Sequence, residues 1–196
     1  MSEFAKDPKK IGQLQDDLNQ VKSYFANLQT ILPNTRKFLT KGTHEYRWEK
    51  YLQKHAPEVA GLDALTIEEL FELKDYDIEC IDYEKGILIN GVFLVLHGDI
   101  VSTESAYTAR RHLDSKGGSG ICNHTHRLGS CYKRDRYGIR GWWENGCLCT
   151  LNPDWITNPN WQQGFSLVHF TTAGRFWVEQ LPIINGELMY GGKLWS

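Results

Sequence analysis

The first regular pattern of hydrophobic positions in the chain covers residues 10–32. Hydrophobic side chains recur there at steps of three and four, at Ile11, Leu14, Leu18, Val21, Phe25, Leu28 and Leu32. This spacing places them along one stripe and predicts an amphipathic helix. Pro33 and Asn34 follow directly, and they predict that the helix ends there.

Three shorter elements follow in the first half of the chain. The segment TRKFLT (35–40) predicts a short strand, and EYRWEKYLQKH (45–55) predicts a helix that ends before Pro57. A third segment begins with TIEELFEL, in which Thr66 and Glu69 have the spacing of a capping box. A helix is therefore expected to begin at Thr66.

The middle of the chain predicts a hairpin and a further strand. Residues 87–97 read ILINGVFLVLH, which is two β-rich runs around Asn90 and Gly91. An Asn-Gly pair in this position is the strongest short signal for a β-hairpin. The segment GSGIC (118–122) predicts another short strand. Both predicted strands precede histidines.

The rest of the chain predicts one more helix and several strands, so helices and strands are mixed along the sequence. Residues 102–117 predict a helix, with Ser102 or Thr103 as its N-cap and the glycine pair at 117–118 as its end. After residue 131 the chain is rich in aromatic residues, glycine and turn formers, which predicts several short strands. We therefore expect one layered α/β domain over residues 1–196.

Composition excludes several classes of function. The 196 residues are 41% hydrophobic, enough for a core, and the net charge of −2 gives no support for a general nucleic-acid or membrane-surface binder. The longest apolar run, VFLVL at 92–96, is too short to span a membrane, and the polar N-terminus lacks a signal-peptide pattern. A cytoplasmic location is expected. The five cysteines are an odd number, which argues against a disulfide framework.

Histidines carry the candidate chemistry. His97 closes an apolar strand, and His124 and His126 follow the strand at 118–122. Positions two apart in an extended segment face the same side, so His124 and His126 can converge on one point. Imidazole is the commonest protein ligand for divalent transition metals. His44 also follows a predicted strand and a glycine, so it joins the candidate site.

The other histidines and two cysteines have structural interpretations. His55 and His112 are expected on helix surfaces, and His169 is expected in a strand. Cys147 and Cys149, in GCLCT, are expected as reduced residues on one face of a strand, because a redox motif would need C-x-x-C.

One alternative uses cysteine ligands. Cys122, His124, His126 and Cys131 form a C-x-H-x-H-x₄-C pattern that could bind zinc. The neighbouring segment YKRDRYGIR (132–140) could then contact nucleic acid.

Four blocks of the sequence resemble one protein family. These blocks are KGTHEYRWEKYLQKHAPEVAGL (41–62), LVLHGD (94–99), NHTHRLG (123–129) and ENGCLCTLNPDW (144–155), the last continued by NPNWQQGF (158–165). In this order they resemble the calcineurin-like metallophosphoesterases of phage and bacterial type. The resemblance implies an α/β/β/α layered sandwich and a phosphodiesterase or phosphomonoesterase.

The resemblance also implies a role for each site residue. His97 and His124 would bind one metal ion and His126 a second, while His44 would lie beside the scissile phosphate. The ions would be manganese, iron, zinc or nickel, and the substrate a phosphoester such as a nucleotide or nucleic acid. From the residues themselves, Arg127 could reach a substrate phosphate or serve as a surface or capping arginine. Asp99 could accept a hydrogen bond from a ligand histidine or be a simple turn residue.

The sequence departs from the family in two places. Thr43 stands where the family has an asparagine metal ligand, and its hydroxyl is a poorer ligand. The D-x-H and G-D-x-x-D blocks of the family are absent from the sequence, and SEFAKDPKK (2–10) resembles the stretch that follows them. The expected domain is thus incomplete at its N-terminus, and a complementing chain or a homo-oligomer would complete it. An inactive relative, or a fragment, that acts as a binding or structural protein is the alternative.

Overall fold

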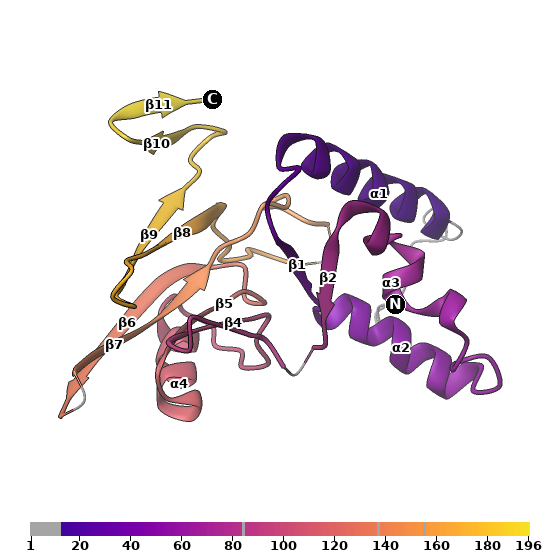
Figure 1. Ribbon diagram of the computed structural model, residues 1–196, viewed down its shortest axis with the longest axis horizontal. Helices are drawn as coiled ribbons and strands as arrows, with labels where there is room; N and C mark the ends of the chain where they lie inside the picture. Colours follow the sequence, from indigo (N-terminus) through magenta and orange to yellow (C-terminus); the bar gives the residue numbers. More distant parts are fainter. Residues whose placement is uncertain (1–12, 84, 137, 155) are drawn as a thin grey trace. The chain divides into compact units, whose positions relative to one another are not determined.

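The computed structural model describes residues 13–83, 85–136, 138–154 and 156–196, and it has a mixed α/β structure with several sheets (Figure 1). The chain divides into two compact units, Met1–Tyr83 and Glu84–Ser196. Each unit has its own hydrophobic core, so each is described by itself.

The first unit begins with the predicted amphipathic helix. Helix α1 spans Leu14–Ile31, and the following Leu32 donates its N–H to the Leu28 carbonyl before Pro33 ends the helix. Residues 10–12 of the predicted helix and the segment 2–10 lie outside the described residues. The strand predicted at 35–40 is confirmed as β1, Lys37–Thr40.

Two further elements complete the sheet of this unit. Helix α2 spans Thr43–His55, and strand β2, Ile78–Ile81, pairs in parallel with β1. The core beside this sheet is formed by Phe25 of α1 with Leu73 and Ile78. The sheet is thus covered by α1 through a cluster of aromatic and aliphatic side chains.

The helix predicted from Thr66 is much shorter than expected. The Thr66 hydroxyl accepts from the Glu69 N–H as a capping residue, but α3 spans only Ile67–Leu70. Glu72 then adopts a left-handed conformation (φ 53°), and 3₁₀-helix η3, Leu73–Tyr76, follows. After this break the Leu73 side chain packs in the core with Phe25 and Ile78. Tertiary packing therefore outweighs the local preference for a longer helix. A second 3₁₀-helix, η2, spans Asp63–Leu65.

The second unit is built on a five-stranded sheet. Its strands are β3 (Ile87–Ile89), β4 (Phe93–Leu96), β5 (Ser119–Cys122), β6 (Leu128–Asp135) and β7 (Gly138–Asn145), in the order β3-β4-β5-β7-β6. The predicted hairpin is confirmed, since β3 and β4 are antiparallel and Asn90 and Gly91 both have positive φ. Strands β4, β5 and β7 are parallel neighbours.

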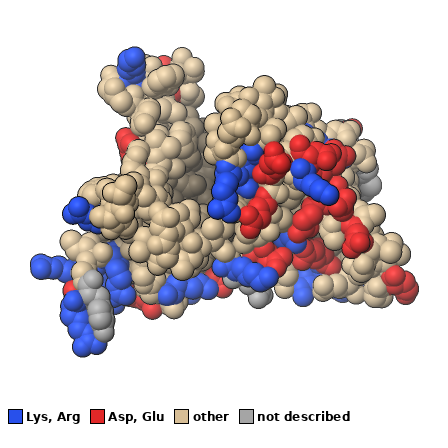
Figure 2. Space-filling view, in the orientation of Figure 1, with Lys and Arg blue, Asp and Glu red and all other residues tan. Residues whose placement is uncertain are grey.

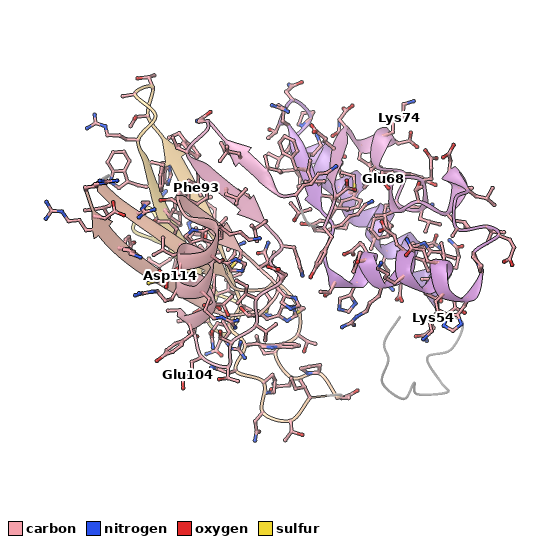
Figure 3. All side chains as sticks on the ribbon, turned by 90° about the horizontal axis from the view of Figure 1, so that it is seen from below. Lys54, Glu68, Lys74, Phe93, Glu104 and Asp114 are labelled. Atoms are coloured by element: carbon pink, nitrogen blue, oxygen red, sulfur yellow. The ribbon has the colours of Figure 1, made fainter. Side chains whose placement is uncertain are left out.

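Both faces of this sheet are covered. Helix α4, Tyr107–Lys116, packs on one face through a cluster of Ala109, Leu113, Leu96, Cys122 and Trp142. On the other face, the antiparallel pair β8 (Gly164–Phe170) and β9 (Phe176–Pro182) packs against Phe93, Ile121 and Trp143. Phe93, labelled in Figure 3, has no exposed surface. The second unit therefore has three layers, a helix, a sheet and a second sheet.

Helix α4 begins five residues later than predicted. Neither Ser102 nor Thr103 is its cap, because Ala106 precedes the helix in a left-handed conformation (φ 70°). The reason lies in contacts far along the chain. The Ser102 carbonyl accepts from the Arg127 guanidinium at 2.6 Å, and Gly129 approaches so closely that a Cβ there would lie 2.4 Å from the Ala106 nitrogen. The predicted end at Gly117 is confirmed.

The outer parts of the second unit are two hairpins. Strands β6 and β7 extend into a hairpin whose free end carries Lys133, Arg134, Arg136 and Arg140, and Figure 2 shows basic side chains gathered there. The short strands β10 (Leu188–Tyr190) and β11 (Lys193–Trp195) form a separate antiparallel pair. Among the described residues, no helix has the length and apolar character that crossing a bilayer requires.

Candidate metal centre

The candidate site lies where two parallel strands of the second unit end. His97 directly follows β4, and Asn123 directly follows β5, its parallel neighbour. The Asn123 N–H donates to the His97 carbonyl at 2.9 Å, so the two loops leave the sheet together. Loops at the carboxyl ends of parallel strands are where α/β sheets place their ligands.

His97 and His124 form a close pair in these loops. The His97 Nε2 lies 3.1 Å from the His124 Nδ1, and the ring centroids are 5.0 Å apart. Two imidazole nitrogens that each bind one ion at about 2.0–2.1 Å are themselves about 3 Å apart when the angle at the ion is near 100°. The pair therefore has the spacing of two ligands of one metal ion.

The H-x-H segment is a loop with an unusual backbone and not the extended segment that the sequence predicts. His124 and His126 both have left-handed φ values, 60° and 59°. Thr125 between them is buried, its N–H donates to the Asn123 carbonyl at 2.6 Å, and its hydroxyl donates to Glu144 at 2.7 Å. These two hydrogen bonds hold the buried Thr125 between two half-buried histidines.

Glu144 is an inner support of the site that the sequence analysis did not identify. It lies on β7, has no exposed surface, and accepts both from Thr125 and from the Ala109 N–H of α4 at 3.2 Å. A buried carboxylate needs such donors. The sequence signal for this role is the position of Glu144 directly after two tryptophans in the segment GWWEN (141–145), where a buried residue is expected.

His112 lies beneath the site and not on the surface of its helix, so that prediction is wrong. Its ring is fully buried, stacks on Trp142 with centroids 5.0 Å apart, and has no hydrogen-bond partner at either nitrogen. Burial lowers its pKa to about 4, although the Asp99 charge acts in the opposite direction. The helix turns this side toward the sheet because Ala109 and Leu113 pack on the same face.

His126 lies with two cysteines. Its Nδ1 is 3.8 Å from the Cys149 Sγ, and His126, Cys147 and Cys149 can each offer a ligand atom within 4.8 Å of the others. Both ligand types, imidazole and thiolate, suit cations such as zinc. Burial, together with the neighbouring Cys149, raises the pKa of the Cys147 thiol to about 11. The expectation that the two cysteines share one face of a strand is wrong, because both follow the end of β7 and lie outside the named strands.

Arg127 and Asp99 flank the histidines. The Arg127 guanidinium donates to the Ser102 carbonyl at 2.6 Å and so ties the loop after β5 to the segment before α4. Asp99 is exposed. The phosphate-binding role of Arg127 and the hydrogen-bonding role of Asp99 stay predictions.

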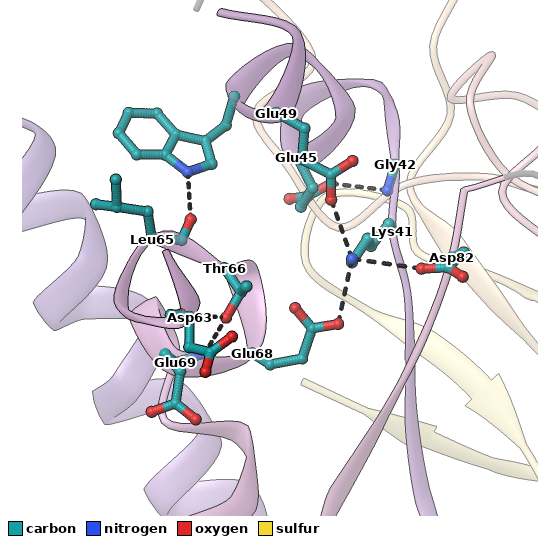
Figure 4. A network of polar contacts seen from close by, with 11 residues as sticks. Lys41, Gly42, Glu45, Glu49, Asp63, Leu65, Thr66, Glu68, Glu69 and Asp82 are labelled. Carbon is teal, nitrogen blue, oxygen red and sulfur yellow. Dashed lines mark hydrogen bonds and ion pairs between the residues drawn. The ribbon is translucent and has the colours of Figure 1, made fainter. Parts of the chain in front are cut away.

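Thr43 and His44 belong to the first unit, where they begin α2. The helix start is fixed by Gly42, whose N–H donates to the Glu45 carboxylate at 2.7 Å (Figure 4). Thr43 is half-buried and His44 is exposed. Their roles as a metal ligand and a catalytic residue stay predictions.

A network around Lys41 holds the strand that precedes these residues. The Lys41 Nζ lies 3.0 Å from Glu49, 3.2 Å from Glu68 and 3.5 Å from Asp82 (Figure 4). Burial alone would lower the pKa of Lys41, but the carboxylates of Glu49 and Glu68 outweigh it and raise the pKa above its usual value. The lysine is therefore a fixed positive charge that joins β1 to α2 and α3.

The alternative zinc module has little support in the structure. The Cys122 thiol is buried and donates to the Trp143 carbonyl, and Cys131 packs against the same core cluster. His124 and His126, in contrast, point toward different partners, His97 and Cys149.

No family model matches this chain, and the comparison with curated proteins gives no match either.

Proposed function

We propose that the chain is a metal-dependent phosphoesterase of the calcineurin-like type, with His97 and His124 as ligands of one divalent ion and His126 as a ligand of a second. The observation that carries the proposal is the 3.1 Å separation of the His97 and His124 nitrogens at the ends of parallel strands. The proposal includes an α/β/β/α layered domain to which both units belong, and Mn, Fe, Zn or Ni as the ion.

The fit of the residues to such an ion is good at the histidine pair. Both rings are neutral ligands when unprotonated, and an ion would replace the hydrogen bond that joins the two ring nitrogens. When bound, a divalent ion would offset the charge of a phosphate group and lower the pKa of a coordinated water. The protein residues would supply position, because Thr125 and Glu144 hold the loop that carries His124 and His126, and the Asn123 N–H joins this loop to the His97 carbonyl.

A hydrolysis assay tests this proposal directly. The chain is incubated with an aryl phosphodiester and with manganese, in the absence and presence of a polypeptide that supplies D-x-H and G-D-x-x-D blocks. We expect hydrolysis that a chelator abolishes, in at least one of the two mixtures. His97→Ala or His124→Ala should lower the rate by more than about 100-fold, because a direct ligand matters more than an outer-shell partner.

His169→Gln is the matched control, because His169 is an exposed histidine on β8 whose ion pair with Glu179 is on the surface. Its rate should equal that of the unmodified chain. Absence of hydrolysis in both mixtures would contradict the proposal.

A second candidate, an inactive relative that binds metal or a phosphoester without turnover, is favoured by Thr43. At this position the resemblance implies an asparagine ligand, and a threonine hydroxyl coordinates a divalent ion less well. Manganese binding that depends on His97 and His124, without hydrolysis in either mixture, would support this candidate.

A further inference from the structure

The group of His126, Cys147 and Cys149 draws on two separate parts of the second unit. His126 belongs to the loop after β5, whereas the two cysteines follow the end of β7. The Cys147 side chain is half-buried and Cys149 is exposed, and neither forms a disulfide. An imidazole and two thiols thus meet at one partly accessible place.

The distances in this group match those between ligands of a tetrahedral ion. With Zn–S of about 2.3 Å and Zn–N of about 2.0–2.1 Å, a tetrahedral angle puts a sulfur and a nitrogen ligand about 3.6 Å apart and two sulfurs about 3.8 Å apart. The His126 Nδ1 lies 3.8 Å from the Cys149 Sγ, and all three ligand atoms lie within 4.8 Å of one another. Small side-chain rotations are enough to close such a site.

Backbone hydrogen bonds hold the ligands in this arrangement. The segment around Gln162 connects them, because the Gln162 N–H donates to the His126 carbonyl at 2.9 Å and the Gln162 carbonyl accepts from the Cys147 N–H at 3.1 Å. The Gln163 side chain donates to the Cys149 carbonyl at 2.8 Å. One short segment therefore fixes the backbone at all three ligand positions before any ion binds.

We propose that His126, Cys147 and Cys149 bind a thiophilic divalent cation of the zinc class, with its fourth position open to water or to a ligand. Two thiolates and one imidazole balance the charge of a divalent ion without any carboxylate. Three protein ligands with an open fourth position are typical of reactive zinc sites, whereas structural sites have four. Binding releases the thiol protons to solvent.

The site shares His126 with the proposed phosphoesterase, and in that respect the inference rests on the proposed function. If both hold, the ion at His126 is a thiophilic ion, and the site at His97 and His124 can hold a different metal. The cation site itself requires no hydrolysis, so it can be tested by binding alone.

Cobalt is a suitable probe, because thiolate ligands give Co²⁺ a charge-transfer absorption in the near ultraviolet that imidazole and carboxylate ligands do not give. The full chain is titrated with Co²⁺ under a non-thiol reductant, and Zn²⁺ is then added in competition. We expect a saturable thiolate band that Zn²⁺ removes. Cys147→Ser and Cys149→Ser should each lower Zn²⁺ affinity by more than about 100-fold, more than loss of an outer-shell group.

Cys131→Ser is the matched control, because Cys131 is a half-buried free thiol of β6 in the same unit. This variant should keep the full band, and Cys149→Ser is expected to fold normally because its side chain is exposed. His97→Ala should abolish hydrolysis but leave the band unchanged, which separates the two proposals. Absence of a thiolate band in the unmodified chain, or a band that keeps its full intensity and Co²⁺ affinity in both Cys147→Ser and Cys149→Ser, would overturn the inference.

Discussion

At the scale of single residues, the loop that presents the histidines is held in a costly conformation. A left-handed backbone at a residue other than glycine costs about 1–3 kcal/mol, and His124 and His126 both adopt it. Thr125 compensates from between them through its hydrogen bonds to Asn123 and Glu144. The positions of the two imidazole rings thus depend on the threonine that lies between them.

Thr125→Val tests this dependence. The variant leaves a Glu144 oxygen buried without its donor, so the free energy of unfolding should fall by about 1–3 kcal/mol. Urea denaturation measures this change. Thr103→Val, at an exposed position, is the control and should change stability by less than about 0.5 kcal/mol. Equal stabilities of the two variants would show that the hydrogen bond to Glu144 contributes little.

His112 makes stability depend on pH. Its folded pKa of about 4 is below the ordinary value of 6.5, so the unfolded chain binds a proton between these values and the folded chain does not. Above pH 6.5 the imidazole is neutral in both states and does not lower the free energy of unfolding. As the pH falls below 6.5, protonation of the unfolded chain lowers the free energy of unfolding, by about 3 kcal/mol at pH 4.

His112→Phe, which keeps an aromatic ring against Trp142, should lack this loss. The measurement is the difference in unfolding free energy between variant and unmodified chain at pH 7 and pH 4. A difference that stays constant with pH would contradict a neutral buried imidazole.

At the scale of elements, the site depends on the close pairing of β4 and β5. Gly120 of β5 has no room for a side chain, because a Cβ there would lie 2.4 Å from the Leu94 carbonyl oxygen and 2.9 Å from the Trp142 ring. The strands carry His97 and His124 at their ends, so their separation sets the separation of the rings.

Gly120→Ala should therefore destabilise the chain by about 1–3 kcal/mol or more, as overpacking of a core does. It should also weaken metal binding at the histidine pair. Thermal unfolding and a manganese titration measure the two effects. In contrast, Gly61→Ala should be nearly neutral, because nothing lies within 4 Å of its added Cβ.

Elements with strong local signals were predictable from the sequence, and those decided by distant contacts were not. The Asn90–Gly91 turn and α1 follow from adjacent residues, and the structure confirms both. The start of α4 depends instead on Arg127, which binds the Ser102 carbonyl. For the same reason the meeting of His126 with Cys147 and Cys149 could not be read from spacing, since it depends on strand order and on the segment around Gln162.

At the scale of the whole molecule, ligand binding should be visible as stability. An ion that binds only the folded chain stabilises it by about 2.7 kcal/mol when its free concentration is 100 times its dissociation constant. Zn²⁺ should therefore slow hydrogen exchange in β7 and in the residues after it, and a chelator should reverse this. Cys149→Ser should show no such effect, and equal protection in both proteins would place the ion elsewhere.

The close approach of Gly129 to Ala106 has a consequence for the evolution of this chain. Gly129 lies on a strand that is partly open to solvent, where most substitutions are normally accepted, yet even a methyl group there would collide with the backbone before α4. Selection is therefore expected to keep this glycine as strictly as the histidines, so its retention in a distant relative would indicate a shared loop geometry even after the ligands themselves had diverged.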